Sequence, residues 1–309
     1  VTIDAGTDRI VCANSIQLNG TPPSVGTGTW TTSGTATIIN PNTPDTWVNN
    51  LSPGANTFRW TVVNGICQTS DEVTIISDRQ PDPAFAGISD SLCNAGTINL
   101  AADLPTQNGR GHWIVTQGTG TISDTAAPNA KYVNPSLGNN QLIWRVSSEF
   151  GACPVTIDTI DFYVDLTPGN AFAGPDARFC ETSTYSMSAN LPLNGGSGEW
   201  SVISGSSNID DLNDHFATVS NLQAGENIYT WTLTSALNVC PPSSDTVTIT
   251  RDLSPGIANA GPDVELCLVN SETLQANAPA IGIGEWQVIS NPSGTPPVFS
   301  PDIQTPDAV

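Results

Sequence analysis

The sequence predicts an all-β protein built from tandem copies of one small β-sandwich. Three observations carry this prediction. A set of landmarks recurs along the 309 residues, apolar residues alternate with polar ones, and turn-forming residues interrupt every stretch long enough for a helix. The 27 glycines and 24 prolines supply many of these turns. Such features are typical of short antiparallel strands that bury one face.

The repeat begins with an Ala-Gly pair, and a cysteine follows six residues after the glycine. A tryptophan lies about 20 residues beyond that cysteine, a second tryptophan about 30 residues further on, and a second cysteine then closes the set. Landmarks that recur in register indicate four copies of one unit. The Ala-Gly pairs begin at Ala5, Ala86, Ala173 and Ala260; the first cysteines are Cys12, Cys93, Cys180 and Cys267; the first tryptophans are Trp30, Trp113, Trp200 and Trp286; the second tryptophans are Trp60, Trp144 and Trp231; the second cysteines are Cys67, Cys153 and Cys240.

Short joints that contain proline separate the repeats, and linkers of this kind are semi-rigid. They divide the chain into repeats at 1–80, 81–167 and 168–254 and an incomplete fourth repeat at 255–309. The fourth copy stops before its second tryptophan and second cysteine. We therefore expect Cys267 to be unpaired by truncation, with its partner beyond the last residue; a reactive free thiol is the alternative.

Alternation of apolar and polar residues marks the strands inside each repeat. Phe58, Trp60 and Val62 fall on one face of a strand, and two later segments repeat the arrangement. About 85 residues with roughly seven short strands fit an immunoglobulin-like β-sandwich. Trp47 has no counterpart in the other repeats, and a core position is favoured for it over an exposed one. We expect the recurring tryptophans to lie in the cores between sheets: Trp30, Trp60, Trp113, Trp144, Trp200, Trp231 and Trp286.

The positions of the cysteines in the repeat predict one disulfide for each complete repeat. Such a bond would close a loop of 55 to 60 residues and stabilise the fold by about 4 kcal/mol in the chain-entropy model. It requires an oxidising compartment, such as the periplasm or the cell exterior. Metal-bound thiolates are excluded because the chain has no Cys-x-x-Cys motif and no histidine near the cysteines. The expected pairs are Cys12–Cys67, Cys93–Cys153 and Cys180–Cys240.

Several short motifs also recur: Ala173-Gly-Pro-Asp176 and Ala260-Gly-Pro-Asp263, Gly198-Glu-Trp200 and Gly284-Glu-Trp286, Leu222-Gln-Ala-Gly225 and Asp245-Thr-Val-Thr-Ile249. With these motifs, the whole chain resembles the PKD/Ig-like repeats of very large surface proteins that gliding bacteria export through the type IX secretion system. The Trp-Asp-Phe-Gly strand of PKD domains is absent, which favours the Ig-like, cysteine-bearing variant of this PKD-like module. The resemblance implies display on the outer cell surface, with adhesion or gliding motility as the role, and it identifies no ligand.

Composition excludes several functions. The net charge is −21, from 8 Lys and Arg residues against 29 Asp and Glu residues, so the chain is unsuited to binding nucleic-acid phosphates or an anionic membrane surface. No apolar run approaches the roughly 18 residues that span a bilayer. Catalysis is not expected, because no nucleophile elbow or Walker loop is present. The two histidines, His112 and His215, do not recur between repeats and are predicted to lie on the surface.

Two kinds of modification or ligand site were weighed. Calcium requires six to eight oxygen ligands, and the loop with Asp210, Asp211, Asn213 and Asp214 is the densest cluster of them; capping of turns by these side chains is favoured. The joints offer two weaker calcium candidates, Asp165 with Asp176 and Asp252 with Asp263. A recurring Asp-Ser/Thr motif resembles the O-glycosylation acceptor of bacteria of this type and identifies Ser91, Thr125, Thr159 and Thr246 as candidates.

These observations predict a non-catalytic stalk segment of a large secreted adhesin. Its partners would be type IX secretion and surface-anchoring components during export, with the external surface or glycan ligand bound outside this segment. Three alternatives remain open: repeats that bind glycans directly through exposed aromatic residues, spacer repeats of a secreted multidomain enzyme, and a subunit of an extracellular filament. No cofactor is required by any of them.

Overall fold

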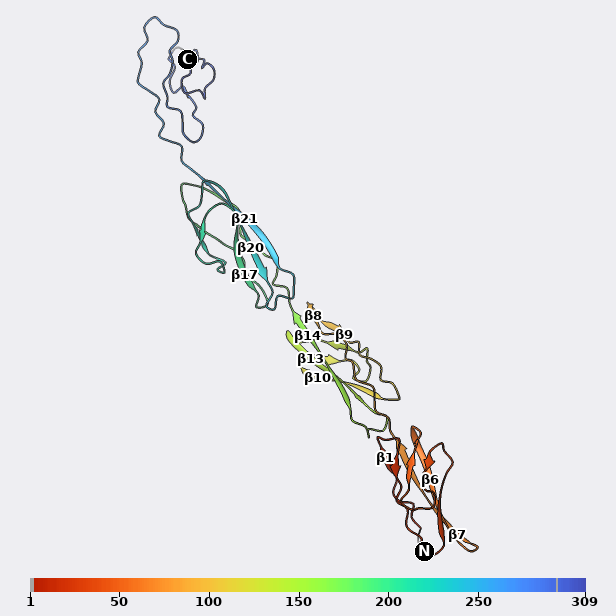
Figure 1. Ribbon diagram of the computed structural model, residues 1–309. Helices are drawn as coiled ribbons and strands as arrows, with labels where there is room; N and C mark the ends of the chain where they lie inside the picture. The colour runs from red at the N-terminus through yellow and green to blue at the C-terminus, as the bar shows by residue number, and fades with distance from the viewer. Residues whose placement is uncertain (1–2, 293) are drawn as a thin grey trace. The chain divides into compact units, whose positions relative to one another are not determined.

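The computed structural model describes residues 3–292 and 294–309, and these residues contain 21 β-strands and no helix (Figure 1). The predicted all-β class is therefore confirmed, as is the tandem immunoglobulin-like architecture. Contacts divide the chain into two compact units. One comprises Val1–Leu166 with Leu237–Cys240, and the other comprises Thr167–Ala236 with Pro241–Val309. Within the described residues, no segment forms a membrane-spanning helix.

The first repeat folds into two sheets that enclose one core. Its longer strands form a sheet in the order β1-β7-β6-β3, and its shorter strands form a second in the order β2-β5-β4. Neighbouring strands are antiparallel, except that β1 runs parallel to β7. The strands are β1 (Arg9–Val11), β2 (Ile16–Gln17), β3 (Thr27–Thr32), β4 (Thr37–Ile38), β5 (Trp47–Asn49), β6 (Gly54–Asn64) and β7 (Cys67–Ser77).

The second repeat has the same seven strands in the same arrangement. Its sheets are β10-β13-β14-β8, with β8 parallel to β14, and β11-β12-β9. The strands are β8 (Asp90–Cys93), β9 (Thr97–Asn99), β10 (Arg110–Gln117), β11 (Thr121–Ile122), β12 (Lys131–Val133), β13 (Gly138–Ser147) and β14 (Thr156–Asp165).

The third repeat repeats this topology once more. Its sheets are β15-β21-β20-β17, with β15 parallel to β21, and β16-β19-β18. The strands are β15 (Ala177–Cys180), β16 (Tyr185–Ser186), β17 (Ser197–Ser204), β18 (Asn208–Ile209), β19 (Thr218–Ser220), β20 (Gly225–Thr234) and β21 (Ser243–Asp252). In every repeat, therefore, the last two strands form a long hairpin that holds the larger sheet together.

A pair of tryptophans occupies the centre of each core. The two face each other across neighbouring strands, with ring centroids 4.9–5.1 Å apart, and all six are buried. Antibody domains place a disulfide against the tryptophan of the third strand, whereas a second tryptophan takes that place here. Pairs of this geometry add about 1 kcal/mol to the stabilisation from burial. The pairs are Trp30–Trp60, Trp113–Trp144 and Trp200–Trp231.

A glycine two residues before the first tryptophan makes room for the second one. A Cβ atom on Gly198 would lie 2.1 Å from a ring carbon of Trp231, and Gly28 and Gly111 show the same close approach in their repeats. The recurring Gly-x-Trp motif is thus a packing requirement.

Trp47 does not lie in the core, contrary to the favoured prediction. It is 52% exposed, whereas its neighbour Val48 is fully buried. Successive residues of a strand point to opposite faces, and β5 places Val48 inward. Trp47 therefore faces outward.

The segment 255–309 contains no strand among its described residues. It retains local bonds of the other repeats: the Trp286 amide donates to Ile303 O (2.8 Å), as the Trp200 amide donates to Leu212 O (2.7 Å). Counterparts of β20 and β21 are not among its residues, so its apolar face has no sheet to pack on. Trp286 is consequently only half-buried, and its predicted core position is wrong for this structure.

Candidate functional site

The disulfides join consecutive repeats, and the predicted pairing within each repeat is wrong. Cys12 of the first repeat bonds Cys153 of the second, and Cys93 of the second bonds Cys240 of the third, each with 4.9 Å between Cα atoms. Cys67 and Cys180, whose expected partners were Cys12 and Cys240, carry free thiols. One disulfide per repeat is therefore replaced by one disulfide at each of the first two joints.

Strand register explains why the two cysteines of one repeat cannot meet. Cys12 follows directly after β1, whose last residue, Val11, pairs with Ser77 at the end of β7. Cys67 lies at the other end of β7, about 30 Å away at 3.3 Å per residue. A disulfide requires Cα atoms less than about 7 Å apart. The parallel pairing of the first and last strands thus separates Cys12 from Cys67.

The first clamp consists of the Cys12–Cys153 bond and the carboxylate of Asp78, which is 4% exposed. Asp78 lies just after β7, where its own amide donates to Val11 O (2.8 Å). Its Oδ2 accepts hydrogen bonds from the Ser148 hydroxyl (2.5 Å) and the Ala152 amide (2.8 Å), both in the loop between β13 and β14. One buried carboxylate therefore fixes the loop of the next repeat beside the disulfide.

Hydrogen bonding sets the ionisation of Asp78. Burial acts to raise the pKa of this carboxyl, but the bonds donated by Ser148 and by the amides of Ala152, Phe150 and Arg79 outweigh it and hold the pKa below its ordinary value. The group is accordingly ionised near neutral pH, as an acceptor of several hydrogen bonds must be.

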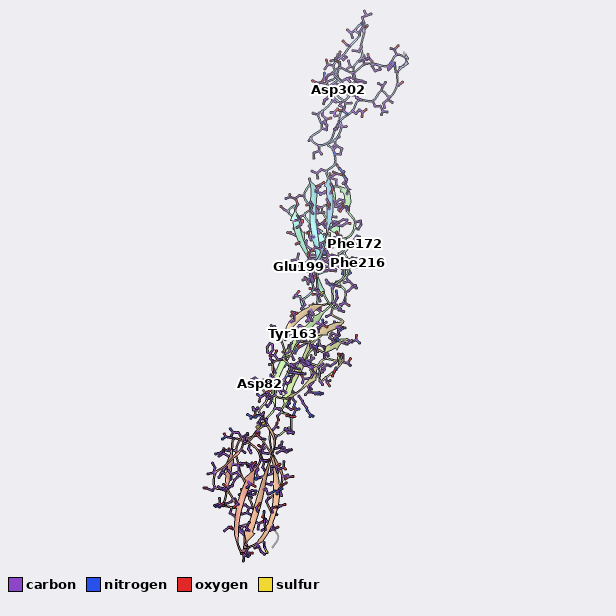
Figure 2. The ribbon with its side chains drawn as sticks, turned by 90° about the vertical axis from the view of Figure 1, so that its right-hand side faces the viewer. Asp82, Tyr163, Phe172, Glu199, Phe216 and Asp302 are labelled. Atoms are coloured by element: carbon purple, nitrogen blue, oxygen red, sulfur yellow. A yellow bond between two sulfur atoms is a disulfide. The ribbon has the colours of Figure 1, made fainter. Side chains whose placement is uncertain are left out.

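Further contacts tie the joint to the second repeat. The Gln80 side-chain amide donates to Pro154 O (3.0 Å), and the Thr156 hydroxyl donates to Asp82 O (2.9 Å). Thr106 also donates to the carboxylate of Asp82, a residue labelled in Figure 2. The joint is thus hydrogen-bonded along its length, which agrees with the semi-rigid linker that its prolines predict.

The second clamp has the same two components as the first. It consists of the Cys93–Cys240 bond and Asp165, which is 3% exposed. Oδ2 of Asp165 accepts hydrogen bonds from the amides of Leu237 (3.0 Å) and Val239 (3.3 Å). The Asn94 amide donates to Asp165 O (2.8 Å), whereas in the first clamp the Asp78 amide donates to Val11 O.

Asp252 occupies the third equivalent position but binds differently. Its carboxylate forms an ion pair with Arg178 (2.6 Å), which lies one strand away. That pair lowers the pKa of Asp252 and raises the pKa of Arg178. Cys180 beside it is exposed and contacts the Ser254 hydroxyl (3.4 Å). Cys267 is likewise an exposed free thiol; its pairing beyond the last residue stays a prediction.

The calcium candidates act as turn caps. Asp210 accepts hydrogen bonds from the amides of Asp211 and Thr218 (2.8 and 2.7 Å), Asp211 from that of Asn213 (2.9 Å), and Asp214 from that of Phe216 (2.9 Å). In the described residues, no group of three His, Cys, Asp or Glu side chains is placed to hold a metal ion. At the joints, Asp176 accepts from the Thr248 amide, while Asp165 and Asp252 are engaged as described above.

The four candidate glycosylation residues, Ser91, Thr125, Thr159 and Thr246, are all exposed. The aspartate that precedes Thr246 has a structural role, because Asp245 accepts a hydrogen bond from the Ala173 amide (2.9 Å). The same holds for the aspartate before Thr159. Modification at these hydroxyls stays a prediction.

The two histidines lie apart from the clamps. His112 is exposed, and His215 contacts Asp214 (3.3 Å) and the ring of Phe216 (4.0 Å between centroids). Phe172 and Phe216, both labelled in Figure 2, are more than half exposed. These exposed aromatics of the third repeat are the kind of side chain that direct ligand binding would require.

Sequence reasoning missed the joint carboxylates as clamps, although a signal was present. Asp78, Asp165 and Asp252 recur at intervals of 87 residues, directly before each proline-containing joint. It also missed the asparagines that close the turn before the long hairpin. Asn140 is fully buried there, and its side chain binds both the amide and the carbonyl of Ser136. Asn227 has the same role in the third repeat.

A scan of protein-family models found no match, and a search of curated proteins found none either. Among solved structures, an I-band fragment of titin is 11% identical with a TM-score of 0.45, over 82% of this chain and 98% of that one. Extracellular domains 3–5 of Drosophila OTK are 12% identical with a TM-score of 0.42, over 80% and 94%. The N-terminal eight Ig domains of Down Syndrome Cell Adhesion Molecule are 12% identical with a TM-score of 0.47, over 81% and 36%.

Proposed function

We propose that this chain is a load-bearing stalk segment of a secreted surface protein. The observation that carries the proposal is the placement of the disulfides at the joints, where each bond links one repeat to the next. Disulfides form in oxidising compartments, as secreted proteins encounter. A buried, hydrogen-bonded carboxylate beside each bond supports the same role, because both groups hold the joint.

The overlap of the two bonds limits how far the chain can extend. The shortest covalent route from Cys12 to Cys240 crosses the bond to Cys153, follows the chain back to Cys93 and crosses the second bond. That route contains about 60 residues, which reach about 210 Å at 3.5 Å per residue, whereas the whole intervening chain would reach about 800 Å. Unfolding under tension therefore cannot lengthen the segment beyond that limit.

Single-molecule pulling of the full chain from its two ends tests this proposal. In the oxidised protein the distance between Cys12 and Cys240 should reach no more than about 210 Å, and in the reduced protein it should reach about 800 Å. Cys67→Ser is the matched control, since this exposed thiol lies outside both bonds and its removal should leave the oxidised trace unchanged. An oxidised protein that lengthens like the reduced one would overturn the load-bearing role.

The finer assignment extends this role to a bacterial surface. We propose attachment or gliding motility as the process, with export by a type IX system. The −21 charge supports display on a surface, because like-charged stalks repel one another. Labelling of intact source cells with an antibody against the chain should stain the surface without permeabilisation. Staining that requires permeabilised cells would contradict the surface assignment and leave the mechanical result intact.

A further inference from the structure

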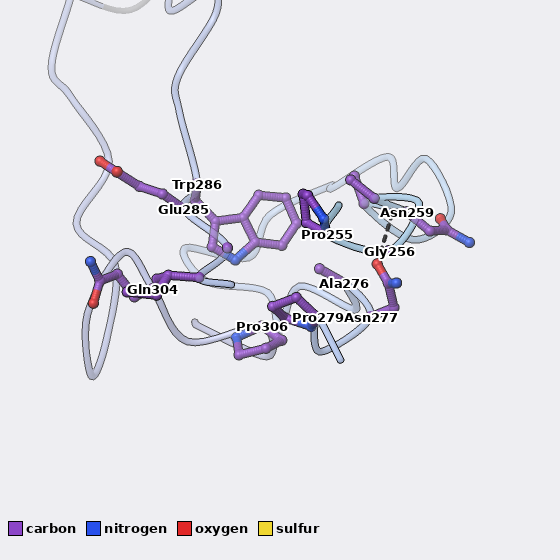
Figure 3. Close-up of a pocket in the computed structure, with 14 residues that line it drawn as sticks. Pro255, Gly256, Asn259, Ala276, Asn277, Pro279, Glu285, Trp286, Gln304 and Pro306 are labelled. Carbon is purple, nitrogen blue, oxygen red and sulfur yellow. Dashed lines mark hydrogen bonds between the residues drawn. The ribbon is translucent and has the colours of Figure 1, made fainter. Parts of the chain in front are cut away.

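The segment 255–309 contains a pocket of about 360 Å³ beside its tryptophan (Figure 3). Apolar side chains and backbone line most of it, including Ala276, Pro279, Trp286 and Pro306. The pocket is not a general feature of the fold, because the same place in each complete repeat is filled.

The third repeat shows what fills that place. Gly284 and Trp286 correspond to Gly198 and Trp200 in the shared Gly-Glu-Trp motif. In the third repeat, the Trp231 ring lies against Gly198, 2.1 Å from where a Cβ would be, whereas a Cβ on Gly284 would meet nothing nearer than Pro279, at 3.8 Å. The pocket therefore lies at the position that the second tryptophan occupies in the complete repeats.

The polar groups around this position match as well. Trp231 Nε1 donates to Asn190 O (3.0 Å). Asn277 is the counterpart of Asn190, since each side chain accepts a hydrogen bond from the residue two before the repeat's Gly (2.7 and 2.8 Å). Among the hydrogen bonds of the described residues, none reaches the carbonyl of Asn277. An indole N–H would satisfy it.

A backbone amide of the segment 255–309 is the second polar group, and its counterparts in the complete repeats bind a carboxylate. In each complete repeat, the backbone amide of the alanine in the Ala-Gly pair donates to the carboxylate of an aspartate in the last strand. The pairs are Ala5 to Asp71, Ala86 to Asp158 and Ala173 to Asp245, at 2.7–2.9 Å. That aspartate is the register partner of the second tryptophan, as in Trp231 and Asp245. The amide of Ala260, the fourth such alanine, has no partner among the described residues.

We propose that this pocket binds an antiparallel β-hairpin in which a tryptophan on one strand is paired with an aspartate on the other. The hairpin completes a sandwich on the 255–309 framework. Its indole fills the space over Gly284 and donates to Asn277 O, and its carboxylate accepts from the Ala260 amide. The pattern is that of β20–β21 in this same chain, so the occupant is defined by residues already described. The inference does not depend on the load-bearing role.

A synthetic peptide spanning residues 225–252, with Cys240→Ser to prevent disulfide exchange, is the probe. Added to the full chain, it should bind and protect amides of 255–309, including that of Ala260, from hydrogen exchange. Trp231→Ala in the peptide should weaken binding about 100-fold or more, because it removes the buried ring. Asp245→Asn should weaken it about 10-fold, since one charge-assisted bond is lost.

Gly284→Val in the chain is the matched control, because it fills the pocket at a site where the free chain has open space. It should abolish peptide binding and leave the circular dichroism of the chain unchanged. Binding that survives Gly284→Val, or a Trp231→Ala peptide that binds as well as the parent, would overturn the proposal. Self-association of the chain that Gly284→Val abolishes, without peptide binding, would assign the pocket to a second copy instead.

A covalent version covers the case of a peptide that aggregates. Residues 223–252, appended after Val309, should fold into two strands on 255–309, and the appended copy of Cys240 should bond Cys180 by the rule of the two joints. Mass spectrometry of the oxidised protein detects that bond. An appended hairpin whose amides stay unprotected from exchange, with Cys180 still free, would contradict the proposal.

Discussion

The third repeat and the segment 255–309 begin with the same framework and end differently. Both anchor their first tryptophan by its amide and by its indole, with Trp200 Nε1 donating to Asp214 O and Trp286 Nε1 to Thr305 O (both 3.0 Å). Of these two segments, only the third repeat has the hairpin β20–β21, and only there do the described residues form strands and a closed core. The difference shows that the first half of the repeat provides local turns and bonds, while the hairpin provides the sheet.

The largest effect is expected from adding a side chain at Gly198, where the ring of Trp231 already occupies the space. Gly198→Val would place side-chain atoms within the buried ring of Trp231 and should leave the third repeat unfolded, because neither ring can move out of a packed core. Calorimetry should show the loss of one unfolding transition. Gly284→Val, where that space is open, should change no transition; equal effects of the two variants would break the distinction between the segments.

Removal of the first clamp's covalent bond is expected to come next. Cys12→Ser opens a loop of 141 residues, worth about 5 kcal/mol in the chain-entropy model. Denaturant unfolding of the oxidised protein should report that loss for the first two repeats. Cys67→Ser is the control and should stay within about 0.5 kcal/mol of the parent. Similar losses in both variants would mean that Cys67 is also bonded.

Loss of the clamp carboxylate should cost less. Asp78→Asn leaves a buried amide where Ser148 and Ala152 donate, and we expect a loss of about 1–3 kcal/mol. Asp252→Asn disrupts only an exposed ion pair and should cost less than Asp78→Asn. Urea unfolding of both variants measures the two losses of stability. A larger loss for Asp252→Asn would show that burial of the carboxylate does not determine the size of the loss.

Acid should weaken the first clamp in the same way. The folded-state pKa of Asp78 is lowered, so its contribution is complete above the unfolded value of about 3.9 and is lost as pH falls through the folded value. Urea unfolding between pH 6 and pH 2 should show stability declining below about pH 4. The Asp78→Asn variant should decline less steeply; an identical decline would remove Asp78 from the explanation.

The smallest effect is expected at the exposed tryptophan. Trp47→Ser should change stability by no more than about 0.5 kcal/mol, because the side chain is half exposed. Val48→Ala, one residue away and fully buried, should cost about 2 kcal/mol. Thermal unfolding of the two variants separates the faces of β5. A greater loss for Trp47→Ser would place Trp47 in the core after all.

The sequence predicted those features that depend on neighbours along the chain. Alternation around Trp60 and Trp144 identified the central strands, and glycine and proline marked the turns. The disulfides depend on the parallel pairing of β1 with β7, which brings residues more than 60 positions apart into register. Spacing alone did not reveal this, because pairing within repeats and pairing between repeats are equally periodic. For Trp47, a shift of one residue decides which face it occupies, and no repeat offered a counterpart.

The offset of the disulfides also sets an order of events during folding. When the first repeat has folded, Cys12 and Cys67 lie at opposite ends of β7, so Cys12 must remain a thiol until the β13–β14 loop of the second repeat has formed. Cys93 likewise must remain a thiol until the third repeat has folded. Because domains fold from the N-terminus as they are synthesised, each oxidation step reports that the following repeat has reached its native state. The cysteines thereby couple disulfide formation in one repeat to the folding of the next repeat.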